Sequence, residues 1–277
     1  ESCAREYKGS GKGREYYNRT GSPTHSMAPL YKLLWLRDNE REVFQKTYKF
    51  ISIKEYVVYK LFNVYMVDYS IASASGLFNI YTRKFDEEIL RDIGISEDKL
   101  SEVVPTTYIL RGMDKYLSEV MGISSSTPVV IGASDGCLAN LGSNSVKEGA
   151  TSITIGTSGA VRVAFNKPVT GEEETVFCYV LTEDKYIVGG AINNGGDAYR
   201  WFRDNFGELE VLEGKERGIS SYEIFNRYLE ASPTGSRGMI FLPFLTGERA
   251  PYWNSNFRGS FIGISDLHTK PDFTRAV

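Results

Sequence analysis

The sequence has few of the residues that mark several common classes of protein. It contains only three cysteines, which lie far apart, and two histidines, so we predict neither a disulfide framework nor a metal site. Acidic residues exceed basic ones by only three, 35 against 32, and no basic cluster stands out, which argues against a nucleic-acid partner. The longest run without a charge, residues 120–134, is too short and too rich in serine to cross a membrane. We therefore expect a soluble, cytoplasmic protein.

The size and composition indicate an ordinary globular protein with two domains. The chain has 277 residues, of which 42% are hydrophobic and 24% charged, and this balance excludes disordered and collagen-like classes. At about 150 residues per domain, two domains are expected. The pattern changes from mainly helical to rich in β-strands near Lys147, so we place the boundary between residues 1–147 and 148–277.

In the first part, apolar spacing and stop signals predict helices over residues 29–39, 53–62 and 86–93, the last ended by Gly94. Three glycines at positions 9, 11 and 13 are expected to interrupt any helix within residues 1–18. Residues 127–132 are typical of a short buried strand that leads into a turn and a helix. Such a unit indicates an α/β architecture with functional residues after the strand.

In the second part, runs of β-forming residues alternate with turn residues. The expected strands are residues 152–155, 160–165, 175–181, 186–191 and 238–242, and the expected helices are residues 197–205 and 222–229.

Asp135, within GASDG at residues 132–136, is the first candidate for chemistry. A carboxylate after a strand, flanked by small residues, can take a proton from a substrate hydroxyl within hydrogen-bond reach. The alternative is that Asp135 caps the helix that begins near Gly136. The local sequence favours the cap.

Two glycine-containing loops are candidates for binding an anion. Gly156 and Thr157 lie in TIGTSG (residues 154–159), whose amides and hydroxyls can hold phosphate oxygens; a plain hairpin turn is an equal alternative. Gly196 lies between a strand and a helix, where helix amides can meet an anion; the alternative is a tight connection with Asp197 as the cap. The apolar loop at residues 241–253 is expected to pack as a structural loop.

Taken in order, these segments resemble the FGGY carbohydrate kinases. GERAPYW (residues 247–253) and GSFIGI (residues 259–264) are similar to the family's C-terminal motifs. TGSPTHSMAPL (residues 20–30), SIASASGLF (residues 70–78) and the Asp135-Gly136 pair are most similar to the gluconate kinases within that family.

The resemblance implies an α/β fold of two actin-like, ribonuclease H-like domains with a cleft between them. Residues 1–147 would then form part of the N-terminal, sugar-binding domain and residues 148–277 part of the C-terminal, nucleotide-binding domain. The implied reaction is phosphorylation of D-gluconate by ATP with Mg²⁺, and a homodimer is one assembly that the resemblance allows.

The resemblance also assigns roles to individual residues. Asp135 corresponds to the catalytic base, which reverses the preference for a cap, and Gly136 follows it in the sugar site. Thr157 and Gly156 correspond to the phosphate loop. Two further pairs complete the assignment: Gly196 and Arg200 for the nucleotide, and Met27 and His25 for the sugar, although His25 could equally be a surface residue.

By the same resemblance, we expect the chain to be an internal part of a longer protein. The family's opening phosphate loop would precede Glu1, and its glycine-rich adenine segment would follow Val277, so the chain is expected to be inactive alone. A xylulose, glycerol or other polyol kinase and a non-catalytic sugar-binding relative are the alternative functions.

Overall fold

The computed structural model describes residues 1–277, which divide into two compact units. Unit 1 comprises Glu1–Ser152 and Val161–Gly190, and unit 2 comprises Ile153–Ala160 and Ala191–Val277. The predicted domain boundary near residue 147 remains a prediction. The two compact units do not divide the chain at one point, because residues 161–190 belong to unit 1.

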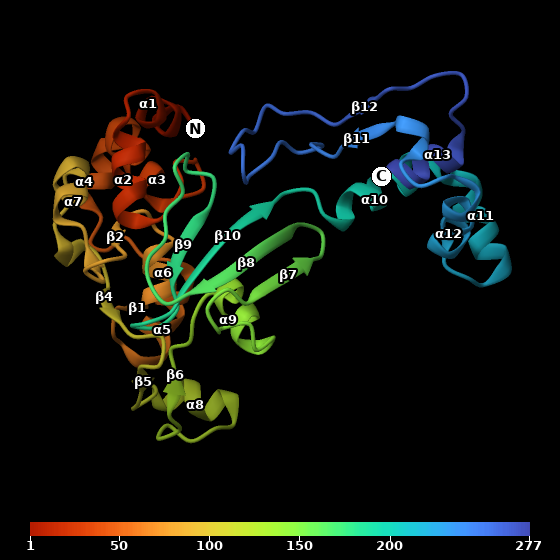
Figure 1. Ribbon diagram of the computed structural model, residues 1–277. Helices are drawn as coiled ribbons and strands as arrows, with labels where there is room; N and C mark the ends of the chain where they lie inside the picture. Colours follow the sequence, from red (N-terminus) through yellow and green to blue (C-terminus); the bar gives the residue numbers. More distant parts are fainter. The chain divides into compact units, whose positions relative to one another are not determined.

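Helices form most of the regular structure (Figure 1). They are α1 (Ser2–Gly9), α2 (Lys12–Thr20), α3 (Pro29–Asn39), α4 (Arg41–Lys46), α5 (Ile53–Phe62), α6 (Tyr69–Ser73), α7 (Glu87–Ile93), α8 (Lys115–Met121), α9 (Asp135–Gly142), α10 (Gly196–Phe206), α11 (Glu208–Arg217), α12 (Ser221–Ala231) and α13 (Lys270–Ala276), with short 3-10 turns η1 (Glu97–Lys99) and η2 (Ser236–Gly238).

The strands are short except in one sheet. They are β1 (Met66–Asp68), β2 (Phe78–Asn79), β3 (Lys84–Phe85), β4 (Glu102–Val104), β5 (Ile109–Leu110), β6 (Val129–Val130), β7 (Thr151–Ile155), β8 (Gly159–Phe165), β9 (Phe177–Val180), β10 (Tyr186–Ile192), β11 (Ile240–Leu242) and β12 (Ser260–Ile262). The longest form a four-stranded sheet in the order β7-β8-β10-β9, in which β9 and β10 are antiparallel. β1 and β4 pair in parallel, whereas β2–β3, β5–β6 and β11–β12 are antiparallel.

Most of the predicted elements are confirmed. The helices expected at residues 29–39, 53–62 and 86–93 are α3, α5 and α7. The helix α7 begins after Asp86, whose side chain accepts the amides of Glu88 and Ile89. The predicted strands correspond to β7 to β11, and the helices to α10 and α12. The helix α11 was not predicted.

The expectation that glycines prevent helices in residues 1–18 is wrong. Gly11 has a left-handed backbone (φ 81°) and separates α1 from α2, but Gly13 lies inside α2. A Cβ on Gly13 would lie 2.3 Å from the Thr24 hydroxyl oxygen. Glycine is therefore required there by close packing, and burial of Tyr16 and Tyr17 in the core stabilises the helix around it.

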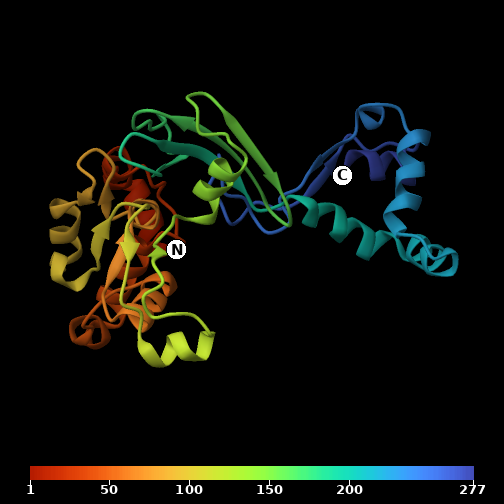
Figure 2. The same ribbon diagram turned by 90° about the horizontal axis from the view of Figure 1, so that it is seen from below.

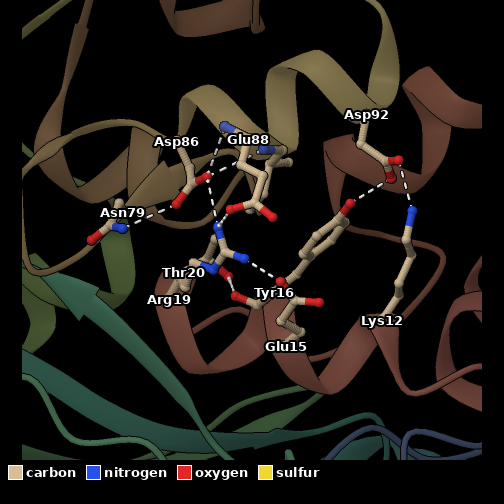
Figure 3. A network of polar contacts seen from close by, with 10 residues as sticks. Lys12, Glu15, Tyr16, Arg19, Thr20, Asn79, Asp86, Glu88 and Asp92 are labelled. Atoms are coloured by element: carbon tan, nitrogen blue, oxygen red, sulfur yellow. Dashed lines mark hydrogen bonds and ion pairs between the residues drawn. The ribbon is translucent and has the colours of Figure 1, made fainter.

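Polar contacts fix α2 against α7 (Figure 3). The Arg19 guanidinium donates to Glu88 at 2.6 Å and to Asp86 at 3.3 Å. Asp92 accepts from Lys12 at 2.7 Å and also from the Tyr16 hydroxyl. Burial and the bond to Asp92 raise the pKa of Tyr16. This network stabilises α2, whose glycine-containing sequence alone is unfavourable for helix formation.

Each unit has its own packing. In unit 1, α1, α2, α3, α4 and α7 cluster together, while α8 projects with β5 and β6 (Figures 1 and 2). Fully buried apolar side chains, among them Tyr17, Leu34 and Phe78, form its core. In unit 2, α12 packs against α11 and α13, and Phe241 of β11 stacks on Phe261 of β12 with ring centroids 4.6 Å apart. No helix is long and apolar enough to span a membrane.

Candidate active site

The amino end of α9 carries Asp135, and a buried polar chain holds this end in place. Asp68 is fully buried, and its carboxylate accepts the backbone amide of Ser70 at 2.9 Å and the Ser70 hydroxyl. Lys54 pairs with the same carboxylate. The Ser70 hydroxyl oxygen in turn accepts the amide of Ser134 at 2.7 Å. The turn before Asp135 is therefore anchored to α6 through groups that water does not reach.

The structure corrects the interpretation of Asp135 as the helix cap. Ser134 is the N-cap of α9, and its hydroxyl accepts the amide of Cys137 at 3.4 Å. Asp135 is the first helical residue, and its side chain is exposed, with Oδ1 accepting the amide of Gly136 at 2.7 Å. Because Ser134 satisfies the helix end, the Asp135 carboxylate is available to a substrate hydroxyl.

The strand before this turn is not the buried strand that we predicted. β6 contains only Val129 and Val130, and 57% of Val130 is exposed. The reason is that β6 pairs only with β5, in a two-stranded antiparallel ribbon, so one of its faces remains at the surface. Of the predicted strand, Ile131 is buried in a hydrophobic cluster and the partly buried Val129 packs against it.

In unit 2, Gly156 and Thr157 lie in the loop between β7 and β8, and both are exposed. The amide of Gly156 donates within the loop to the Ser158 carbonyl at 2.8 Å. The loop carbonyls face the start of α10: that of Gly156 accepts the amide of Gly196 at 2.7 Å, and that of Thr157 accepts the amide of Gly195 at 2.9 Å. A Cβ on Gly195 would lie 2.7 Å from the Ser158 carbonyl oxygen, so the two loops interlock.

The predicted nucleotide residues lie in the first turns of α10. Gly195 is the N-cap, so the alternative in which Asp197 caps the helix is wrong. The Asp197 carboxylate instead pairs with Arg200 one turn later. Gly196 and Arg200 are both exposed. The structure thus brings the exposed Thr157 loop together with the start of α10, although the Gly196 amide is already bonded to protein.

The apolar loop at residues 241–253 is anchored by buried polar groups. Glu248, only 5% exposed, accepts the amide of Asn193 at 2.6 Å and that of Arg249 at 2.8 Å. The buried Asn194 side chain donates to the Gly247 carbonyl at 2.9 Å. The rings of Phe244 and Tyr252 pack edge to face 5.7 Å apart. The loop therefore supports the residues that lead into α10.

His25 and Met27 lie on the segment before α3, in unit 1. Nδ1 of His25 accepts the amide of Met27 at 3.2 Å, which fixes the orientation of the imidazole. The Met27 side chain is half exposed. These two residues and the Asp135-Gly136 pair form two groups on different elements of the same unit.

Residues that the sequence did not single out complete the neighbourhood of Asp135. Ser134 and Ser70 are two of them, and Arg162 of β8 is the third: its Nε lies 3.0 Å from the point where a Cβ on Gly136 would be. A basic residue among the apolar residues of a strand was the available signal for Arg162. The contact with Ser70 spans 64 residues, and no local pattern predicts it.

The chain matches two family models in succession. Residues 1–142 match the N-terminal domain of the FGGY family of carbohydrate kinases, and residues 151–277 match its C-terminal domain. The chain belongs to this family. It is 45% identical over 276 residues to a protein named gluconokinase from Bacillus subtilis (strain 168), and the alignment covers 100% of this chain and 54% of that relative.

Solved structures show the same likeness. A gluconate kinase and a ligand-bound xylulose kinase, both from Lactobacillus acidophilus, each match with a TM-score of 0.92 and 35% identity. Each match covers 99% of this chain and 54% of the solved chain. The predicted α/β fold of two actin-like, ribonuclease H-like domains is thereby confirmed. The chain spans about half the length of the relatives it matches.

Proposed function

We propose that the full-length protein containing this chain transfers the γ-phosphoryl group of ATP to the primary hydroxyl of D-gluconate, giving 6-phosphogluconate and ADP. The observation that carries the proposal is the exposed Asp135 carboxylate at the start of α9, where Ser134 already serves as the cap. The 45% identity to a protein named gluconokinase supports gluconate as the substrate.

In this proposal Asp135 is the general base. It accepts the proton of the primary hydroxyl as the hydroxyl oxygen attacks the γ-phosphorus. The buried bonds from Ser70 to Ser134 orient the turn that carries the base, and positioning of this kind contributes much of the catalysis in phosphoryl transfer. Met27 and His25 would line the sugar site together with Gly136.

The nucleotide would bind to unit 2. Because the Gly156 amide is bonded within its loop, the amide and hydroxyl of Thr157 are the donors that we assign to the phosphate. Gly196 and Arg200 would contact the nucleotide from α10. Mg²⁺ would be held mainly by the ATP phosphates and water. Bound Mg²⁺ would neutralise charge on the transferred group.

The Asp135→Asn variant of the full-length protein tests the base. We expect kcat for gluconate, measured by coupled ADP formation, to fall about 10²–10⁴-fold, because general-base catalysis contributes about that much. Asp114→Asn is the matched control: Asp114 is the N-cap that precedes α8, and asparagine caps a helix equally well. Turnover by Asp135→Asn within about tenfold of the unmodified protein would show that Asp135 is not the base.

A second candidate keeps the kinase and changes the sugar. The ligand-bound xylulose kinase matches the fold as well as the gluconate kinase does. Comparing kcat/KM for D-gluconate, D-xylulose and glycerol decides between them. Absence of ADP formation with all three would instead support a non-catalytic sugar-binding protein. Cytoplasmic location and homodimer formation remain predictions.

A further inference from the structure

The proposed substrate is an anion, and the site described so far lacks an assigned group for its carboxylate. Gluconate carries the carboxylate at one end of its carbon chain and the phosphorylated hydroxyl at the other. A cationic group is therefore needed beside the base but not on it. An arginine suits this task because its planar guanidinium can donate two parallel hydrogen bonds to a carboxylate.

Arg162 is the basic side chain that the structure places at the start of α9. It leaves β8 half-buried. On the neighbouring strand β10, a Cβ on Gly189 would lie 2.3 Å from the Val161 carbonyl oxygen and 3.1 Å from both Cα and Cγ of Arg162. The far end of the Arg162 side chain lies at Gly136, where a Cβ would be 3.0 Å from Nε and 3.4 Å from Nη2. Gly136 thus leaves room that the guanidinium occupies, whereas Gly189 is required chiefly by the close backbone of β8.

The electrostatics of this place favour an anionic ligand. The amino end of a helix carries partial positive charge, so a cation there is unfavourable for the helix. The Asp135 carboxylate in the same turn offsets part of this effect. A carboxylate bound there would interact favourably with both the helix end and the guanidinium.

The directions of the two side chains also fit a substrate with two distinct ends. Consecutive residues of an α-helix leave its axis roughly 100° apart. Asp135 and the guanidinium at Gly136 therefore approach a ligand at the start of α9 from different sides. One can meet the hydroxyl end of the sugar acid while the other meets the carboxylate end.

We propose that Arg162 binds the carboxylate of the sugar acid, and that Gly136 provides the space that lets its guanidinium reach the site. This inference rests on the proposed function and adds to it the residue that selects an acid over a neutral sugar. Gly136 then has a specific role in substrate choice, because a Cβ there would lie 3.0 Å from Nε and a longer side chain would displace the guanidinium.

The test compares D-gluconate with D-gluconamide, in which a neutral amide replaces the carboxylate. Dissociation constants are measured by calorimetry on the full-length protein with a non-hydrolysable ATP analogue. For Arg162→Met we expect gluconate to bind about 10–100-fold more weakly, as loss of charged hydrogen bonds predicts. Gluconamide should change by less than about threefold. Arg162→Lys should retain part of the preference for the acid, because it keeps the charge but not the paired geometry.

A second variant tests the space rather than the charge. Gly136→Asn leaves Arg162 in the chain but places a side chain where its guanidinium lies, so the preference for gluconate over gluconamide should again fall. Arg111→Met, which removes an exposed arginine elsewhere in unit 1, is the matched control. Melting temperatures of all variants establish that they fold.

The outcomes separate this inference from the proposed function. An unmodified protein that does not phosphorylate gluconate overturns both. An unmodified protein that does so, with an Arg162→Met variant that still prefers the acid to the amide, overturns the inference alone. Equal weakening of both ligands, or loss of affinity for the ATP analogue, also overturns it, because Arg162 would then serve the fold or the transferred phosphate.

Discussion

Replacement of Ser70 by alanine should separate the stability of unit 1 from the positioning of the base. The Ser70 hydroxyl donates to the buried Asp68 carboxylate and accepts the Ser134 amide at 2.7 Å. A neutral hydrogen bond contributes about 1 kcal/mol and a charged one about 1.5–3 kcal/mol. Ser70→Ala should therefore lower the free energy of unfolding by about 2.5–4 kcal/mol.

Ser73 provides a matched control in the same helix. It is also fully buried, and its hydroxyl donates to the Ser70 carbonyl at 3.0 Å and accepts the Val180 amide at 3.1 Å. Two neutral bonds predict a loss of about 2 kcal/mol for Ser73→Ala. At about 2–4 °C per kcal/mol, calorimetry should find melting temperatures lowered by about 5–15 °C for Ser70→Ala and about 4–8 °C for Ser73→Ala.

The two variants should differ in catalysis. The Ser134 amide loses its partner only in Ser70→Ala, so the turn that carries Asp135 loosens in that variant alone. We expect kcat for gluconate to fall about tenfold or more, because small displacements of a catalytic group have large effects. Ser73→Ala should keep kcat within about twofold. Equal kcat values in the two variants, measured well below both melting temperatures, would refute the positioning argument.

Two further predictions concern stability. Gly13→Ala should destabilise the protein by about 1–3 kcal/mol in denaturant unfolding, because its Cβ would collide with Thr24. Gly9→Ala is the control: a Cβ there would have nothing within 4 Å, so the change should be neutral or stabilising by up to about 1 kcal/mol. A similar loss of stability in both variants would contradict the packing argument. The amide of Thr269 and nearby hydroxyls lower the pKa of Asp272 from 3.8 to about 2, so its stabilising contribution is present above pH 4 and is lost as the pH falls through 2. Asp272→Asn should remove that part of the acid dependence of unfolding, and an unchanged pH profile would exclude this carboxylate as its source.

How much of the fold the sequence predicts depends on how local the determining signal is. The helix α5 begins at Ser52, which forms a capping box with Glu55, and α7 lies between Asp86 and Gly94. These signals lie within a few residues of one another, and the predicted bounds agree with the structure. The helix α2 was missed because its Gly13 is explained only by Thr24, which packs against it from outside the helix.

The candidate site follows the same rule. The sequence singles out Asp135 because small residues surround it, but it does not reveal that Ser134 is the cap. Ser134 and Asp135 are adjacent, and only the backbone geometry at the start of α9 shows which of them is the N-cap. The anchoring of Ser134 by Ser70 and the approach of Arg162 to Gly136 depend on tertiary contacts. Local patterns therefore identified Asp135 as a candidate, the family resemblance assigned it the role of base, and the contacts that hold it in place required the fold.

The bonds between the residue 156–158 loop and α10 have a consequence for motion. The Gly156 and Thr157 carbonyls accept the amides at the start of α10, so the loop and the first turn of the helix move as one rigid unit. A hinge cannot lie between them, and Thr157 and Arg200 must travel together when either shifts. The amides of Gly195 and Gly196 should then exchange with deuterium slowly and at the same rate, because both exchange only when the loop separates from α10.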